Sequence, residues 1–158
     1  MADDLLDELV RVWVRNGARS ERSARKIAQQ IGATFRMQRV SADEYRHLVD
    51  QMPGKDLDDH IHSAAAVAKA PSTLLTANTK DFPVQPLRRK GVAVCHPDDY
   101  FVDLLEQEPA AVMEVLTAMF AARSRPPMSL PNVLGTLERS GLTKFVAAAS
   151  RHINEDAL

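Results

Sequence analysis

The sequence has one cysteine, no long apolar run and no excess of charge of either sign. Cys95 alone cannot close a disulfide within the chain, which is typical of proteins in a reducing cytoplasm. No apolar run approaches the roughly 20 residues that cross a bilayer. Residues 1–7 are acidic, where a secretion signal would be basic and then apolar. We therefore expect a cytoplasmic protein with no membrane partner.

The charges are nearly balanced, with 20 Lys and Arg against 21 Asp and Glu and a formal net charge of −1. Such a chain does not bind polyanions through bulk charge, so an RNA partner would need a local basic patch or a metal ion. Arg88–Lys90 is one candidate patch, although a solvated turn explains it more simply. A second basic region contains Arg22, Arg25, Lys26, Arg36 and Arg39.

Apolar spacing and capping signals predict a helix-rich chain with two short strands. Gly32 is expected to close the second helix, and Ser41 with Glu44 to form a capping box on the third. Helices are expected over 1–16, 20–31, 41–51, 58–69, 84–90, 98–106, 109–123, 130–140 and 142–152, and buried strands over 73–76 and 91–94.

A strand, a helical crossover and a second strand form a parallel α/β unit. Residues 1–100 are therefore expected to form an α/β core in which helices flank a parallel sheet. Residues 101–158 are expected to form an all-helical C-terminal extension.

Acidic and amide side chains lie at the start of one predicted helix and after the end of the next predicted strand. Asp58 and Asp59 open an alanine-rich helix, and Asn78 and Asp81 follow the exit of the next strand. The helix start and the strand exit lie at the same edge of the sheet, so these side chains are expected to converge. Crowded carboxylates repel one another unless a cation compensates, and oxygen ligands favour Mg²⁺ or Mn²⁺. The alternative is that Asp58 and Asp59 only favour the start of the helix.

His60 and His62 flank these aspartates and could suggest zinc. Their spacing of two residues directs them to different sides of the helix, so surface roles are expected instead. Cys95, at the end of a strand, is expected to be an inert core residue.

Jointly, these segments resemble the second half of PIN domains of the VapC toxin type. The resemblance covers nearly the whole chain and rests on motifs that are modest individually and fairly specific together. They are the aspartates and alanines of 58–66, Thr76-Ala77-Asn78-Thr79-Lys80-Asp81-Phe82-Pro83, Gly91-Val92-Ala93-Val94, His96-Pro97-Asp98, and the tail with Arg125-Pro126-Pro127 and Gly141-Leu142-Thr143-Lys144-Phe145.

The resemblance implies an endoribonuclease that depends on Mg²⁺ or Mn²⁺ and acts as the toxin of a toxin–antitoxin pair. It implies RNA as substrate, a cognate antitoxin as partner and a homodimer as a family expectation. Carried over by motif, the catalytic residues are Asp59, Glu8, Asn78 and Asp81. The implied metal ligands are Asp59, Glu8 and Asp81, with Asp58 beside them. For Glu8 a solvated helix-face charge is an equally good explanation.

The sequence departs from the family pattern at its N-terminus. The family's first strand, which carries an aspartate of the site, is expected upstream of Met1, so the core is expected to be N-terminally incomplete. A start assigned too far downstream, a shortened chain, a strand supplied by another polypeptide or copy, or a degenerate relative would each explain this. The competing hypothesis is therefore a catalytically inactive PIN-like module that binds an antitoxin or RNA.

Overall fold

The computed structural model describes residues 2–121 and 129–155, and the chain divides into two compact units. The first unit contains Met1–Leu74 and Asn78–Val94, and the second contains Leu75–Ala77 and Cys95–Leu158. The expected domain boundary at residue 100 stays a prediction.

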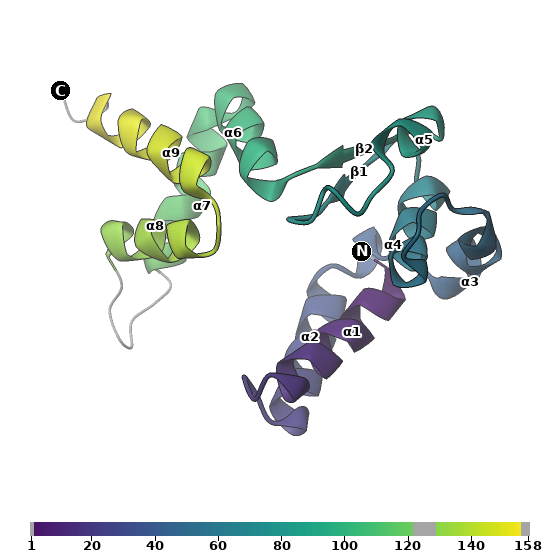
Figure 1. Cartoon of the computed structure of the whole chain (residues 1–158). Coiled ribbons are helices and arrows are strands. Elements are labelled where there is room, and N and C mark those ends of the chain that lie inside the picture. The colour runs from purple at the N-terminus through teal and green to yellow at the C-terminus, as the bar shows by residue number, and fades with distance from the viewer. Residues whose placement is uncertain (1, 122–128, 156–158) are drawn as a thin grey trace. The chain divides into compact units, whose positions relative to one another are not determined.

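The elements follow the order expected from the sequence (Figure 1). Up to the second strand they are α1 (Asp3–Arg15), α2 (Glu21–Thr34), the 3₁₀ turn η1 (Arg36–Gln38), α3 (Ala42–Tyr45), the 3₁₀ segment η2 (Arg46–Gln51), α4 (Leu57–Ala68), β1 (Ser72–Leu75), α5 (Val84–Arg89) and β2 (Val92–Cys95). They are followed by α6 (Pro97–Gln107), α7 (Pro109–Ala121), α8 (Leu130–Arg139) and α9 (Thr143–Glu155).

Helices α1 and α2 lie side by side (Figure 1). Ser20 caps α2 by accepting a hydrogen bond from the Ser23 N–H, as its sequence position predicts. The prediction that Gly32 closes this helix is wrong, because α2 continues to Thr34 and Gly32 is buried within it. A Cβ at Gly32 would lie 3.2 Å from Leu6 Cδ1, so the missing side chain lets the two helices approach closely.

The start of α3 carries the predicted capping box between Ser41 and Glu44. The expected helix over 41–51 is nevertheless split into α3 and the 3₁₀ segment η2. Tyr45, at the end of α3, is fully buried and packs in one cluster with Ala64 and Ala65 of α4. Its hydroxyl donates a hydrogen bond to Asp4 Oδ2 at 2.6 Å, which ties α3 to the start of α1.

Strands β1 and β2 form a two-stranded parallel sheet. The Ser72 N–H donates to the Gly91 carbonyl at 3.1 Å, and the Thr76 N–H donates to the Cys95 carbonyl at 3.0 Å. The α/β class with flanking helices is thereby confirmed. The expectation that β1 is buried is wrong, because alternate side chains of this strand are exposed. A second cluster contains Phe82, Leu87 and Val92, with the α4 residues Ala66 and Val67 packed against it.

The second unit is helical from Pro97 onward through α6, α7, α8 and α9, as expected. Its apolar cluster includes the buried residues Leu105 and Phe145. The Asp98 carboxylate is 3% exposed and accepts hydrogen bonds from the N–H groups of Phe145 (2.8 Å) and Lys144 (3.0 Å). An aspartate of α6 therefore caps the start of α9. No helix in the described part of the chain is long and apolar enough to cross a membrane.

Candidate functional site

The aspartates that open α4 have different local roles. Asp56 is the N-cap: its Oδ1 accepts a hydrogen bond from the Asp58 N–H at 3.0 Å. Asp58 is exposed and Asp59 is partly buried, both in the first turn of α4. Because Asp56 supplies the cap, the carboxylates of Asp58 and Asp59 are not used to cap this helix. Both still lie in the first turn, where the helix dipole favours a carboxylate, so the simpler explanation also fits their position.

Asp59 lies in a region of crowded negative charge. Burial is the largest cause that raises the pKa of its carboxyl above the ordinary value of 3.8, and the charge of Asp56 adds to it. Asp81 and Asp58 raise this pKa further, while His62 acts in the opposite direction. The raised pKa means that burial, and then the neighbouring aspartates, disfavour the ionised form of Asp59.

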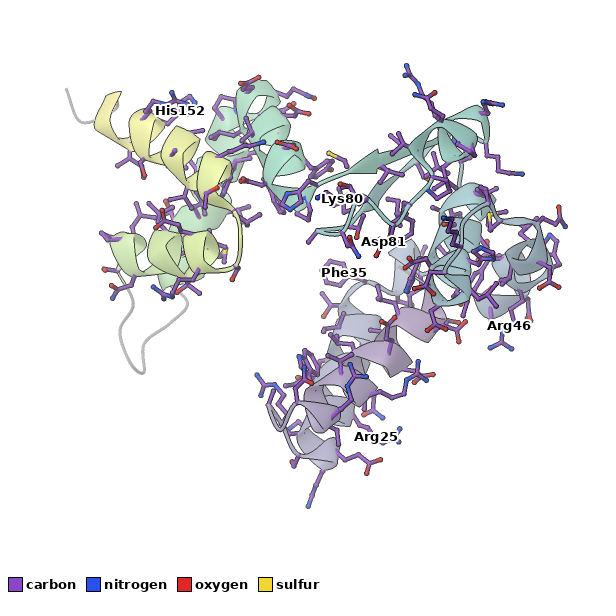
Figure 2. All side chains as sticks on the ribbon, viewed as in Figure 1. Arg25, Phe35, Arg46, Lys80, Asp81 and His152 are labelled. Carbon is purple, nitrogen blue, oxygen red and sulfur yellow. The ribbon has the colours of Figure 1, made fainter. Side chains whose placement is uncertain are left out.

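Asn78 and Asp81 lie on the loop that follows β1, where Figure 2 labels Lys80 and Asp81. The side-chain amide of Asn78 donates a hydrogen bond to Asp81 Oδ2, and the Asp81 N–H donates to the Asn78 carbonyl at 3.3 Å. Asn78 thereby helps to orient the Asp81 carboxylate. Since the charge of Asp81 raises the pKa of Asp59, the loop and the start of α4 act on one another electrostatically.

Glu8 reaches the same region from α1. Its Oε2 lies 3.0 Å from His62 Nε2, and the two side chains are 46% and 20% exposed. His62 also lowers the pKa of Asp59, so this histidine interacts with two of the residues expected in the site. Glu8 thus has a specific partner, while 46% of its side chain is exposed to solvent.

The expectation of surface roles for both histidines is wrong. His60 is 7% exposed, and its Nε2 lies 3.3 Å from the Gly54 carbonyl, while His62 turns toward Glu8. The sequence prediction considered only the spacing between His60 and His62. Comparing His62 with Asp59 would have placed both on one side of α4, because a spacing of three brings residues to the same side of a helix. The contact with Glu8, 54 residues away, had no such local signal.

Ser63, one helical turn beyond Asp59, is 1% exposed. Its hydroxyl has no hydrogen-bond partner within the described residues. Residues four apart lie on the same face of a helix, so this hydroxyl is on the Asp59 side of α4. Across the same described part, no three His, Cys, Asp or Glu side chains are close enough together to hold one ion. The arrangement is a partial set of oxygen ligands.

Comparison with known protein families gives a match over the second unit. Residues 97–151 match the family model described as the VapC50 C-terminal domain, which begins here at the first residue of α6. The chain is also 31% identical over 107 residues to the curated protein "Putative ribonuclease VapC50" of Mycobacterium tuberculosis. That alignment covers 68% of this chain and 62% of the relative. No solved structure matches the chain significantly.

The match over residues 97–151 falls in the helical tail that the sequence predicted. The chain belongs to the VapC-type PIN family, in the branch with a helical C-terminal region. It spans 62% of the length of the curated relative that it matches.

Proposed function

We propose that this protein is a VapC-like toxin that cleaves RNA phosphodiester bonds with the help of a divalent metal ion. The observation that carries the proposal is the Glu8–His62 contact, which brings the glutamate of α1 to the helix that Asp58 and Asp59 open. The raised pKa of Asp59, caused first by burial and then by neighbouring aspartates, is consistent with it. The name of the relative, "Putative ribonuclease VapC50", supports the same class of reaction.

The residues present fit Mg²⁺ or Mn²⁺ by the chemistry of their donors. Asp59 and Asp81 supply carboxylate oxygens, and the unpaired hydroxyl of Ser63 lies on the Asp59 face. Mg²⁺ commonly keeps several waters and uses one or two protein carboxylates, so a partial ligand set suffices for it. Asp59 and Asp81 would hold the ion, with Glu8 and Asp58 close by.

Each protein group has a distinct task in this proposal. The carboxylates of Asp59 and Asp81 bring negative charge to the site, and Asn78 fixes the orientation of Asp81. His62 positions Glu8 and offsets part of the charge near Asp59. When bound, the metal ion would supply activation of a water and stabilise negative charge on the phosphate.

The test is RNA cleavage by the purified chain in the presence of Mg²⁺ or Mn²⁺. Asp59→Ala and Glu8→Gln are expected to abolish cleavage. Asp7→Asn is the matched control, because Asp7 is an exposed acid next to Glu8 on the same helix. Equal cleavage by the wild type and by Asp59→Ala would overturn the proposal.

A second candidate function is a non-catalytic module that binds an antitoxin or RNA. It is favoured by one observation: within the described residues no group of three potential ligands is assembled. If this function is correct, the chain binds RNA or an antitoxin, and no metal ion stimulates cleavage.

A cognate antitoxin, a homodimer and a cytoplasmic location are part of the same proposal. They follow from the family and from the composition of the chain. Co-expression with a cognate antitoxin is expected to suppress the toxicity of this chain.

A further inference from the structure

A pocket of about 780 Å³ in the first unit adjoins the acidic site. Helices α1, α2 and α4 line it: α4 contributes Asp58, Ile61 and His62, and α1 contributes the face that carries Glu8. One end of the pocket therefore contains the acidic site's own residues. The remainder is lined by residues to which the proposed reaction assigns no role.

Two arginines lie farther along the same face of α1. Arg11 and Arg15 follow Glu8 by three and seven residues, a spacing that keeps all three side chains on one side of the helix. At a rise of 1.5 Å per residue, Arg15 lies about 10 Å along the helix axis from Glu8. Val12, which lies between the two arginines, and Ile61 of α4 give the pocket an apolar wall.

Three of the four acidic residues that line the pocket have partners of their own, and the fourth is Asp58 at the start of α4. Asp4 accepts a hydrogen bond from Tyr45 and lies 3.6 Å from Arg46. Glu21 forms an ion pair with Arg25 at 2.8 Å, on α2 where Figure 2 labels Arg25. Glu8 is held by His62, as described above.

Arg11 and Arg15 are both exposed, and neither makes an ion pair with any residue that the structure describes. By contrast, Arg25 and Arg39, which the sequence offered as part of a basic region, are paired with Glu21 and Asp3. The available positive charge of this pocket is therefore concentrated on α1.

We propose that Arg11 and Arg15 bind phosphates of the RNA strand next to the phosphate held at the acidic site. This inference rests on the proposed ribonuclease function for the identity of the ligand. Guanidinium groups suit phosphate oxygens because their N–H groups can donate in pairs. The strand then follows α1, with Val12 and Ile61 as apolar contacts for its ribose or base.

The experiment measures binding of a labelled single-stranded RNA of about ten nucleotides to the whole chain in EDTA, at several KCl concentrations. The test variant is Arg11→Gln/Arg15→Gln. The control is Arg22→Gln/Lys26→Gln, which removes the same charge at the same four-residue spacing from exposed positions of α2 outside this pocket. Thermal melting followed by circular dichroism confirms that both variants are folded.

The test variant is expected to bind several-fold more weakly. The slope of log affinity against log salt should fall by about 1.4, since each phosphate contact to a single strand contributes about 0.7. The control is expected to retain most of the affinity and slope of the wild type. Equal binding by the wild type and the test variant, an equal loss in the control, or no RNA binding by the wild type would overturn the inference.

A cleavage assay with Mg²⁺ separates this inference from the function on which it rests. If binding depends on Arg11 and Arg15 but the RNA is never cut, the ribonuclease proposal fails and the phosphate site stands. If the RNA is cut and the test variant binds and cuts it like the wild type, the phosphate site fails and the ribonuclease proposal stands.

Discussion

The imidazole of His62 lies 3.0 Å from the carboxylate of Glu8, although 54 residues separate them in the sequence. This contact joins α1 to α4 at the point where the family pattern places two of its acidic residues. It makes the position of Glu8 depend on a histidine that the motif does not include.

Replacing His62 with alanine is expected to reduce RNA cleavage and Mg²⁺ affinity by about 10- to 100-fold, because groups that orient metal-site carboxylates typically contribute this much. Single-turnover cleavage and calorimetric titration with Mg²⁺ measure the two effects. His47→Ala, at an exposed position of η2, is the matched control and should behave like the wild type. Unchanged metal affinity in His62→Ala would contradict a positioning role.

Asp59→Asn is expected to stabilise the metal-free protein at neutral pH while abolishing cleavage. Burial, and then the charge of Asp56, raise the pKa of Asp59, so its ionised form costs folding free energy. The folded protein holds this proton more tightly, so the wild type loses stability as the pH rises from 3.8 through the folded-state pKa. Urea unfolding across this range should show that the free energy of unfolding of the variant increases relative to that of the wild type as the pH rises. A variant that is less stable than the wild type at neutral pH would contradict this.

Tyr45→Phe tests the connection between α3 and α1. The Tyr45 hydroxyl donates to Asp4 at 2.6 Å, and its loss should lower the free energy of unfolding by about 1 kcal/mol. Burial, and then the Asp4 hydrogen bond, raise the pKa of Tyr45 to about 12. The phenol's contribution is therefore fully present below its ordinary value of 10 and is lost as the pH rises through about 12. Denaturation of both proteins at alkaline pH should show the difference shrinking, and a constant difference would count against it.

Asp98→Ala is expected to lower the stability of the second unit by on the order of 2–4 kcal/mol, because one buried and one part-buried N–H group at the start of α9 lose a charged acceptor. Asp103→Ala, an exposed aspartate on the same helix, should change stability little. Chemical denaturation monitored by α-helical circular dichroism compares the two variants.

The Asp98 contribution should also depend on pH. Burial acts to raise the pKa of this carboxyl, but the N–H groups of Phe145 and Lys144 outweigh it, and the pKa lies below 3.8. The stabilisation is therefore complete above pH 3.8 and is lost as the pH falls through the folded-state pKa. The stabilities of the wild type and Asp98→Ala should approach each other in acid, and curves that stay parallel would contradict the assignment.

Helix caps that depend only on residues close together in the sequence could be predicted from the sequence. The Ser20 cap and the capping box of Ser41 with Glu44 each involve residues within a single turn, so they predicted where α2 and α3 begin. Gly32 was misread because its role depends on Leu6, which packs against it from another helix. The sequence alone does not distinguish a glycine inside a helix from a glycine that ends one, because the difference depends on how the neighbouring helix packs.

The candidate site could likewise be predicted only in part. The motif offered Asp59, Asn78 and Asp81 as site residues, and a hydrogen bond joins Asn78 to Asp81 in the structure. The role of these residues stays a prediction. The Asp56 cap and the His62 contact were missed, the latter because it joins segments whose packing no local pattern specifies.

The central claim is the proposal that Asp59 of α4 and Asp81 of the loop after β1 hold a divalent metal ion, with water completing its coordination. Calorimetric titration of Mg²⁺ or Mn²⁺ into the wild type and into Asp59→Ala tests it most directly, with Asp50→Ala, an exposed aspartate of η2, as the control. We predict one saturable binding event in the wild type and in Asp50→Ala, and none in Asp59→Ala. No binding by the wild type, or equal binding by all three proteins, would contradict the claim.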